Sequence, residues 1–156
     1  MASWSQVEAE TPDLSALARE YLGAHKHLTL ATLRKDGSPR ISGVEIEMSR
    51  GEVWVGSMPG GVKARDLQRD PRYAVHSGSS DPDAGWTGDA KLAGRAEEVH
   101  DDALKREIAG EGAPAGPFHL FRCDITELVV VRLGEPADHL LIESWHEGRG
   151  LSTLRR

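Results

Sequence analysis

The residues best suited to chemistry in this 156-residue sequence lie in the stretch GSMPGGVKARDL, from Gly56 to Leu67. Here a predicted strand passes through a turn containing Gly60 and Gly61 into a helix whose first turn holds Lys63. A helix N-terminus offers free backbone N–H groups and a positive dipole end, and glycines let a ligand approach the backbone. The stretch is therefore typical of a phosphate site, although an ordinary connection with a solvated lysine has the same pattern.

Other well-known catalytic signatures are missing from the sequence. Lys63 is neither directly preceded by glycine nor followed by Ser or Thr, and no GxGxxG motif occurs, so Walker and Rossmann nucleotide sites lose support. The sequence contains no HExxH motif, no pair of cysteines and no serine elbow, so it shows no residues for metal-dependent hydrolysis or acyl transfer. His25 and His27 have the spacing of a metal pair but no third ligand, so we expect no metal site.

Composition excludes several classes of partner. The net charge is -6 with Lys and Arg spread along the chain, which argues against nucleic acid. No apolar run approaches the roughly 18 residues of a membrane span, and the first residues do not resemble a signal peptide. The single cysteine, Cys123, lies in an apolar run and is expected to be buried. We therefore expect a cytoplasmic protein with no nucleic-acid or membrane partner.

The elements that must position this stretch are mostly strands. Residues 1–10 are polar and are expected to form a mobile tail, followed by a helix with Thr11 as N-cap and Gly23 at its end. Two further short helices are expected at 62–70 and 102–109. About eight strands are expected, at 27–33, 40–48, 52–57, 72–77, 86–99, 118–125, 128–133 and 139–145. Residues 11–156 are thus expected to form one mostly β (α+β) domain.

Turn signals and pattern changes refine this expectation. Asp36-Gly37 and Arg50-Gly51 predict tight turns between successive strands. In the second strand the apolar residues change parity around Ser42 and Gly43, which predicts a β-bulge there.

Three blocks of the sequence, taken in order, resemble a known family. They read TLRKDGSPRISGVEIE, then EVWVGSMPGGVKARDLQRDPRYAVHS, then GDAKLAGRAEEV, and they extend from about Leu28 to Val99. The sequence is similar to the pyridoxamine 5′-phosphate oxidase-like family, which includes deazaflavin-dependent reductases. The resemblance implies an FMN-binding split β-barrel with short accessory helices, assembled as a homodimer with a cofactor cleft between the subunits.

The resemblance also implies a set of cofactor-binding residues. Arg40 and Lys63 would contact the cofactor phosphate, and Ser57 would supply a hydroxyl. The backbone of Ile41, Ser42 and Gly43 would follow the edge of the flavin ring. The rest of the implied set comprises Gly56 beside Ser57, and Asp89 and Lys91, which would reach the ring or ribityl chain across the dimer interface. Trp145 is either a core residue or an aromatic contact of the flavin.

The function implied is that of a flavin- or deazaflavin-dependent oxidoreductase acting on a small molecule, with FMN or the deazaflavin coenzyme F-420 as cofactor. Glu45 stands where the oxidases carry a lysine and Val62 where they carry an arginine, which argues against pyridoxamine 5′-phosphate oxidase activity itself. The alternative is a non-catalytic flavin-binding protein or a haem-binding relative, for which His76 or His146 would be the axial ligand. No catalytic residue is assigned.

Overall fold

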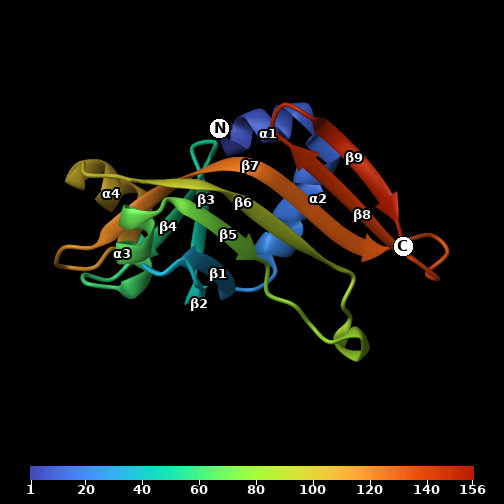
Figure 1. Ribbon diagram of the computed structural model, residues 1–156, viewed down its shortest axis with the longest axis horizontal. Helices are drawn as coiled ribbons and strands as arrows, with labels where there is room; N and C mark the ends of the chain where they lie inside the picture. The colour runs from blue at the N-terminus through green and yellow to red at the C-terminus, as the bar shows by residue number, and fades with distance from the viewer.

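The computed structural model describes residues 1–156 as one nine-stranded antiparallel sheet with four α-helices (Figure 1). The strands are β1 Leu28–Leu33, β2 Pro39–Val44, β3 Ile46–Ser49, β4 Glu52–Ser57, β5 Arg72–His76, β6 Gly88–Glu98, β7 His119–Leu133, β8 Leu140–His146 and β9 Gly150–Arg155. The helices are α1 Trp4–Glu10, α2 Pro12–Gly23, α3 Val62–Arg69 and α4 Asp102–Ala109. The mostly β fold class is confirmed. No helix has the length and apolar character needed to cross a membrane.

The sheet curls into a split barrel because of one short connection. Its strand order is β2-β1-β5-β6-β7-β4-β3, so β2 and β3 lie at opposite ends of this path. They are nevertheless joined by Glu45 alone. A single residue spans less than about 4 Å, so the two edge strands must approach each other and the sheet must close on itself. Strands β8 and β9 extend the sheet from β7 outside this path.

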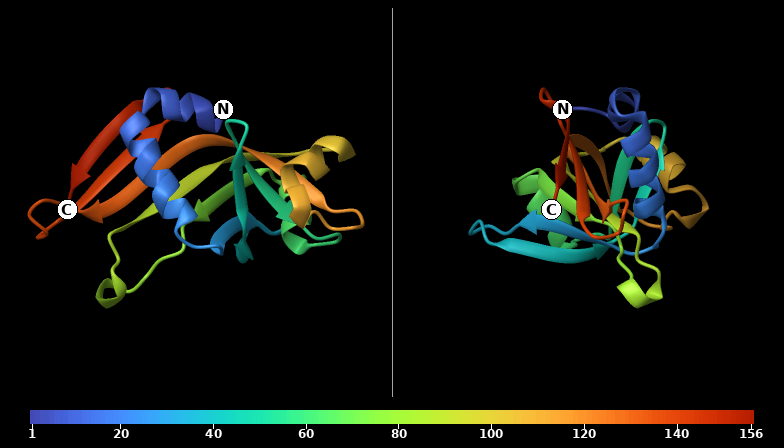
Figure 2. Two further views of the ribbon diagram at one scale, coloured as in Figure 1. Left: turned by 180° about the vertical axis from the view of Figure 1, so that it is seen from behind. Right: turned by 90° about the vertical axis from the view of Figure 1, so that its right-hand side faces the viewer.

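The core fills the barrel and continues beneath α2. Strand residues at alternate positions point inward, among them Leu28 and Leu30 of β1 and Leu92 of β6, all 3% exposed or less. Helix α2 packs on β6 and β7 with the buried face that Leu14 and Leu22 share. Figures 1 and 2 show that α1 and α2 cover one face of β6 to β8, whereas the opposite face carries no helix.

The N-terminal residues are packed into the molecule, and the expectation of a mobile tail over residues 1–10 is wrong. Trp4 and Val7 of α1 are fully buried, and Ser3 caps the helix with Gln6 in a reciprocal capping box. Ala2 forms a backbone bridge with Ile125 of β7. The segment looked polar because only one side of this short helix is apolar. The predicted helix from Pro12 to Gly23 is confirmed.

The predicted bulge in the second strand is also wrong. The β1–β2 register runs without interruption from Leu28 opposite Val44 to Leu33 opposite Pro39. The parity of apolar residues changes because Glu45 ends one strand and the next begins on the opposite edge of the sheet. The 40–48 run is therefore two strands.

The sheet has a bulge elsewhere, and it explains a second error. Residues 118–125 and 128–133 were expected to be separate strands but belong to the single strand β7. Ile125 pairs with Gly94 and Glu127 pairs with Ala93, which leaves Thr126 as the extra residue of the bulge. The polar interruption in the sequence marks this bulge rather than a turn.

The ninth strand was not expected from the sequence. Strand β9 pairs with β8 along its whole length, yet its residues are almost all exposed. Without one buried face, the segment lacks the alternation of polar and apolar residues by which strands are recognised.

Candidate functional site

The turn between β4 and α3 is built closely around Ser57. Gly60 has a φ of 71°, a left-handed conformation that favours glycine, and a Cβ at Gly61 would overlap the Oγ of Ser57. Helix α3 has no side-chain cap, whereas Asp101 caps α4. The first N–H groups of α3 are therefore available to a ligand.

Lys63 connects this turn to the edge strand β2. Its Nζ donates a hydrogen bond to the carbonyl oxygen of Gly43 at 3.1 Å. A Cβ at Gly43 would have nothing within 4 Å, so the backbone of β2 is open to a ligand at this point. Three predicted site residues, Gly43, Ser57 and Lys63, are thus brought together.

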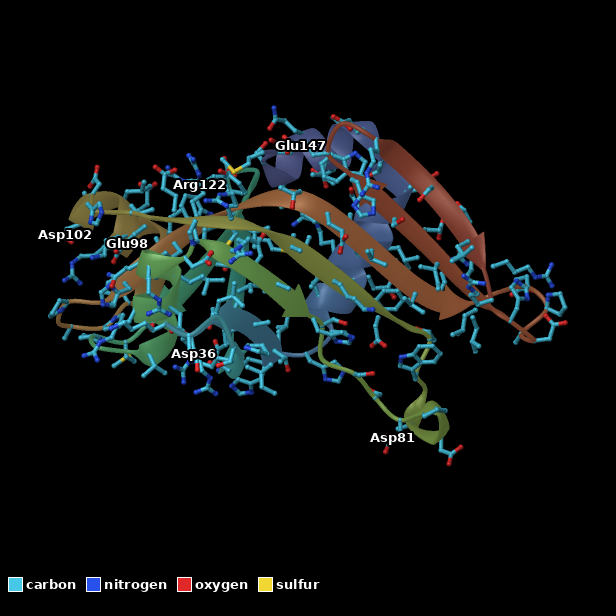
Figure 3. The ribbon with its side chains drawn as sticks, viewed as in Figure 1. Asp36, Asp81, Glu98, Asp102, Arg122 and Glu147 are labelled. Atoms are coloured by element: carbon cyan, nitrogen blue, oxygen red, sulfur yellow. The ribbon has the colours of Figure 1, made fainter.

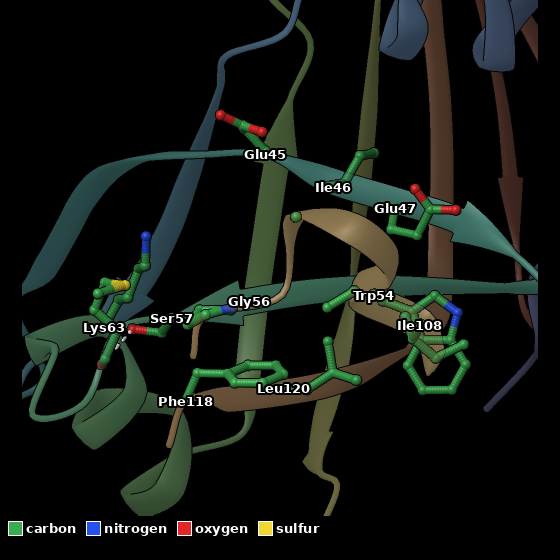
Figure 4. Close-up of a pocket in the computed structure, with 14 residues that line it drawn as sticks. Glu45, Ile46, Glu47, Trp54, Gly56, Ser57, Lys63, Ile108, Phe118 and Leu120 are labelled. Carbon is green, nitrogen blue, oxygen red and sulfur yellow. Dashed lines mark hydrogen bonds between the residues drawn. The ribbon is translucent and has the colours of Figure 1, made fainter. Parts of the chain in front are cut away.

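A groove of about 460 Å³ begins at this point and runs between β3, β4, the start of β7 and α4. Figure 4 shows Lys63, Ser57 and Gly56 at one end and Trp54 and Ile108 toward the other. Phe118 and Leu120 also line it. The groove therefore joins a polar end, where Lys63 forms no ion pair, to an apolar body.

Arg40 is held at a different place from Lys63. Its Nε donates to Oδ2 of the buried Asp66 at 2.7 Å, and Asp66 also accepts hydrogen bonds from Thr32 and Arg69, each at 2.8 Å. Burial raises the pKa of the Asp66 carboxyl, but the hydrogen bonds from Arg69, Arg40 and Thr32 outweigh it and leave the pKa below its ordinary value.

Arg40 lines a shallow depression rather than the groove. The depression also contains Arg34, Lys35 and Asp36, and Figure 3 locates Asp36 at the end of the β1–β2 hairpin. The structure therefore does not bring Arg40 and Lys63 to one cavity.

The other predicted residues of β2 and β6 lie outside the groove. Ile41 is 75% exposed and Ser42 is half-buried, both in regular pairing with β1. Asp89 and Lys91 lie on the face of β6 that α2 does not cover, opposite Val131 and Val129 of β7. Oδ1 of Asp89 is buried without a hydrogen-bond partner in the chain. Their contribution to a site across a dimer interface stays a prediction.

Trp145 belongs to the core. It is 1% exposed, and its indole N–H donates to Oε2 of Glu10 at 2.7 Å, which ties β8 to α1. Its surroundings come from its own chain, so we remove it from the candidate site in favour of the core-packing alternative.

The candidate haem ligands His76 and His146 lie outside the groove, and the single cysteine is buried. Nδ1 of His76 lies 2.6 Å from the Ser77 carbonyl oxygen, and Nδ1 of His146 lies 3.4 Å from a Glu127 carboxylate oxygen. Neither histidine lines the groove. Cys123 is fully buried, and burial, followed by nearby Asp124, raises the pKa of its thiol. No three His, Cys, Asp or Glu residues are grouped as metal ligands.

Sequence reasoning missed the apolar body of the groove. A signal was present in β4, where Val53, Trp54 and Val55 are consecutive and all buried. A strand that is apolar on both faces must be covered on both. The second cover is α4, whose Ile108 packs with Trp54 in a small cluster separate from the main core.

A family model matches the chain over most of its length. The family model for pyridoxamine 5′-phosphate oxidase matches residues 14–132. No curated protein matches the chain.

Three solved structures illustrate the shared fold. PhzG from Burkholderia lata 383, in complex with tetrahydrophenazine-1-carboxylic acid, has a TM-score of 0.64 and 14% identity, covering 98% of this chain and 92% of its own. A Clostridium acetobutylicum protein related to general stress protein 26 has a TM-score of 0.63 and 15% identity, covering 90% and 92%. General stress protein 26 from Bacillus anthracis has a TM-score of 0.60 and 16% identity, covering 72% and 89%. The family model and the shared split barrel together show that this chain belongs to the pyridoxamine 5′-phosphate oxidase family.

Proposed function

We propose that this chain is a flavin-dependent oxidoreductase that binds FMN, or the deazaflavin coenzyme F-420, with its phosphate at the Lys63 end of the groove. The observation that carries the proposal is the grouping of Lys63, Ser57 and the uncapped start of α3 at one end of an apolar groove. A phosphate there would receive backbone N–H groups, a hydroxyl and a formal positive charge. The open backbone of β2 from Ile41 to Gly43 would receive the flavin ring beside the phosphate. The apolar body of the groove would then hold the apolar part of a substrate.

The role of the protein in such a reaction is binding and orientation. A bound flavin supplies hydride-transfer chemistry itself, so the chain need not provide an acid, a base or a nucleophile. Lys63 would fix the phosphate. The apolar side chains of Trp54, Phe118 and Leu120 would exclude water from a substrate bound next to the flavin. The family membership and the binding of a small organic acid by PhzG support a small-molecule substrate.

A homodimer is part of this proposal. The face of β6 to β9 that carries no helix presents Val131, Ile142 and Leu154 in one row that begins at Asp89. Leu154 is 45% exposed in the single chain, and Leu133 nearby on β7 is 41% exposed. A second copy packed on this face would cover these side chains and enclose Asp89 and Lys91.

The proposal is tested by the absorption spectrum of the purified protein and by titration with FMN. Bound FMN shows an oxidised-flavin spectrum, the deazaflavin absorbs at shorter wavelength, and haem would give a Soret band. Bleaching of the bound flavin by a reductant, followed by reoxidation with a small organic acceptor, supports catalysis. Tight flavin binding without such turnover would favour the non-catalytic alternative, and a Soret band the haem-binding one.

A further inference from the structure

One side of the groove is acidic, and the chain pairs only one of its two carboxylates with a cation. Glu45 and Glu47 line the groove with Lys63, and these three are its only charged residues. Figure 4 shows Glu45 just before β3 and Glu47 on it, both on the side away from Phe118 and Leu120. Glu45 lies 3.6 Å from Lys26 and 3.4 Å from His27, both of which are largely exposed. Glu47 has no ion-pair or hydrogen-bond partner.

Glu47 stands directly beside the apolar floor. It is the cross-strand partner of Trp54, so the two side chains share one face and their Cβ atoms are expected to lie about 5 Å apart. The indole N–H of Trp54 donates to the Ser49 carbonyl oxygen at 3.1 Å and is not available to a ligand. A molecule in the groove therefore meets an apolar ring and a free carboxylate together.

The arginine that flanks Trp54 on β7 is already engaged. Arg122 of β7 is the other cross-strand neighbour of Trp54, but its guanidinium pairs with Glu97 at 2.7 Å and lies 3.8 Å from Asp124. It does not line the groove. Once a phosphate occupies Lys63, the remaining charges of the groove are negative, and they disfavour an anionic substrate.

We propose that the groove selects substrates with an apolar, aromatic body and a cationic amine that pairs with Glu47, with Glu45 as a weaker second carboxylate. This inference rests on the proposed function, because it assigns Lys63 to the cofactor. It makes Glu47 a specificity-determining residue. It also predicts discrimination against anionic substrates of the same shape.

The test compares three ligands of similar size on the FMN-loaded protein by isothermal titration: tryptamine, the neutral indole-3-ethanol and indole-3-acetate. We expect tryptamine to bind about tenfold more tightly than indole-3-acetate, the effect expected of one partly exposed ion pair and the matching repulsion. Glu47→Gln should remove most of this preference, and Glu45→Gln should reduce it less. Glu20→Gln, on the exposed side of α2 and without an ion pair, is the matched control and should change nothing.

The inference would be overturned if the amine and the acid bound equally, if the acid bound more tightly, or if none of the three ligands bound. A preference for the amine that persists in Glu47→Gln would also overturn it. The same titrations on flavin-free protein separate this failure from that of the proposed function. In the flavin-free protein no phosphate neutralises the charge of Lys63, so the ratio of tryptamine affinity to indole-3-acetate affinity should be smaller than in the FMN-loaded protein but should still favour tryptamine. If FMN itself does not bind, the proposed function fails, whereas the amine preference can still be measured.

Discussion

Lys63, on the first turn of α3, donates its hydrogen bond to the carbonyl of Gly43, a residue twenty positions earlier on the edge strand β2. The contact joins the two segments that the sequence analysis assigned to one cofactor site. A phosphate at this point would compete with the Gly43 carbonyl for the same ammonium group. The candidate site is therefore preassembled, with its cation already facing the groove.

Self-association is the first expected outcome. Because the helix-free face of β6 to β9 exposes Leu133 and Leu154, light scattering at micromolar concentration should give the mass of a dimer. Ile142→Glu would place a charge in the centre of that face and should shift the protein toward the monomer. Thr153→Glu, on the exposed last strand but on its opposite side, is the control. A wild-type monomer that binds FMN tightly would contradict the dimer.

The barrel strands could be predicted because each has a buried inner face and a turn signal at its end. Strand β4 and helix α4 have the predicted bounds, and the Asp36-Gly37 turn forms with Gly37 at a φ of 83°. Strand β9 could not be predicted because exposure on both faces leaves no periodic signal. The position of β3 at the edge opposite β2 likewise could not be predicted, because it depends on pairing with β4 and not on the pattern of residues 40–48.

The candidate site was predictable only in part. Gly56, Ser57 and Lys63 are close together in sequence, and local turn chemistry is enough to group them. Arg40 was expected beside Lys63, but its guanidinium pairs with the buried Asp66, a contact set by the packing of α3 against β1, the neighbour of β2. Trp145 had two open interpretations, and only the position of α1 places it in the core.

Asp66 should make the free energy of unfolding fall at acidic pH. Its pKa is lowered in the folded state, so its contribution is fully present above its unfolded pKa, near 3.8, and is lost as the pH falls through the folded value. Asp66→Asn should lower the free energy of unfolding at neutral pH by about 1.5 to 3 kcal/mol, because charge-assisted hydrogen bonds are lost. Urea titrations at pH 7 and at a pH well below 3.8 should show that the variant and the parent converge in acid. An equal difference at both pH values would contradict this role.

The N-terminal helix should contribute strongly to stability. Trp4 is fully buried in the main cluster, so Trp4→Ala should lower the free energy of unfolding by about 3 to 5 kcal/mol. Glu8→Ala, on the same helix, removes only an exposed contact to Arg19 and should cost less than about 1 kcal/mol. Chemical denaturation measures both. If the two variants were equally stable, α1 would not be part of the folded core.

The phosphate anchor is tested most directly by the affinity of Lys63→Ala for FMN, measured by isothermal titration. Loss of one charge-assisted hydrogen bond of about 1.5 to 3 kcal/mol should weaken FMN binding by about one to two orders of magnitude. Riboflavin, which lacks the phosphate, should bind the parent weakly and be nearly indifferent to the change. Lys35→Ala, on the β1–β2 hairpin outside the groove, should leave FMN affinity unaltered. If Lys63→Ala bound FMN as tightly as the parent, the Lys63 end of the groove would not be the phosphate site.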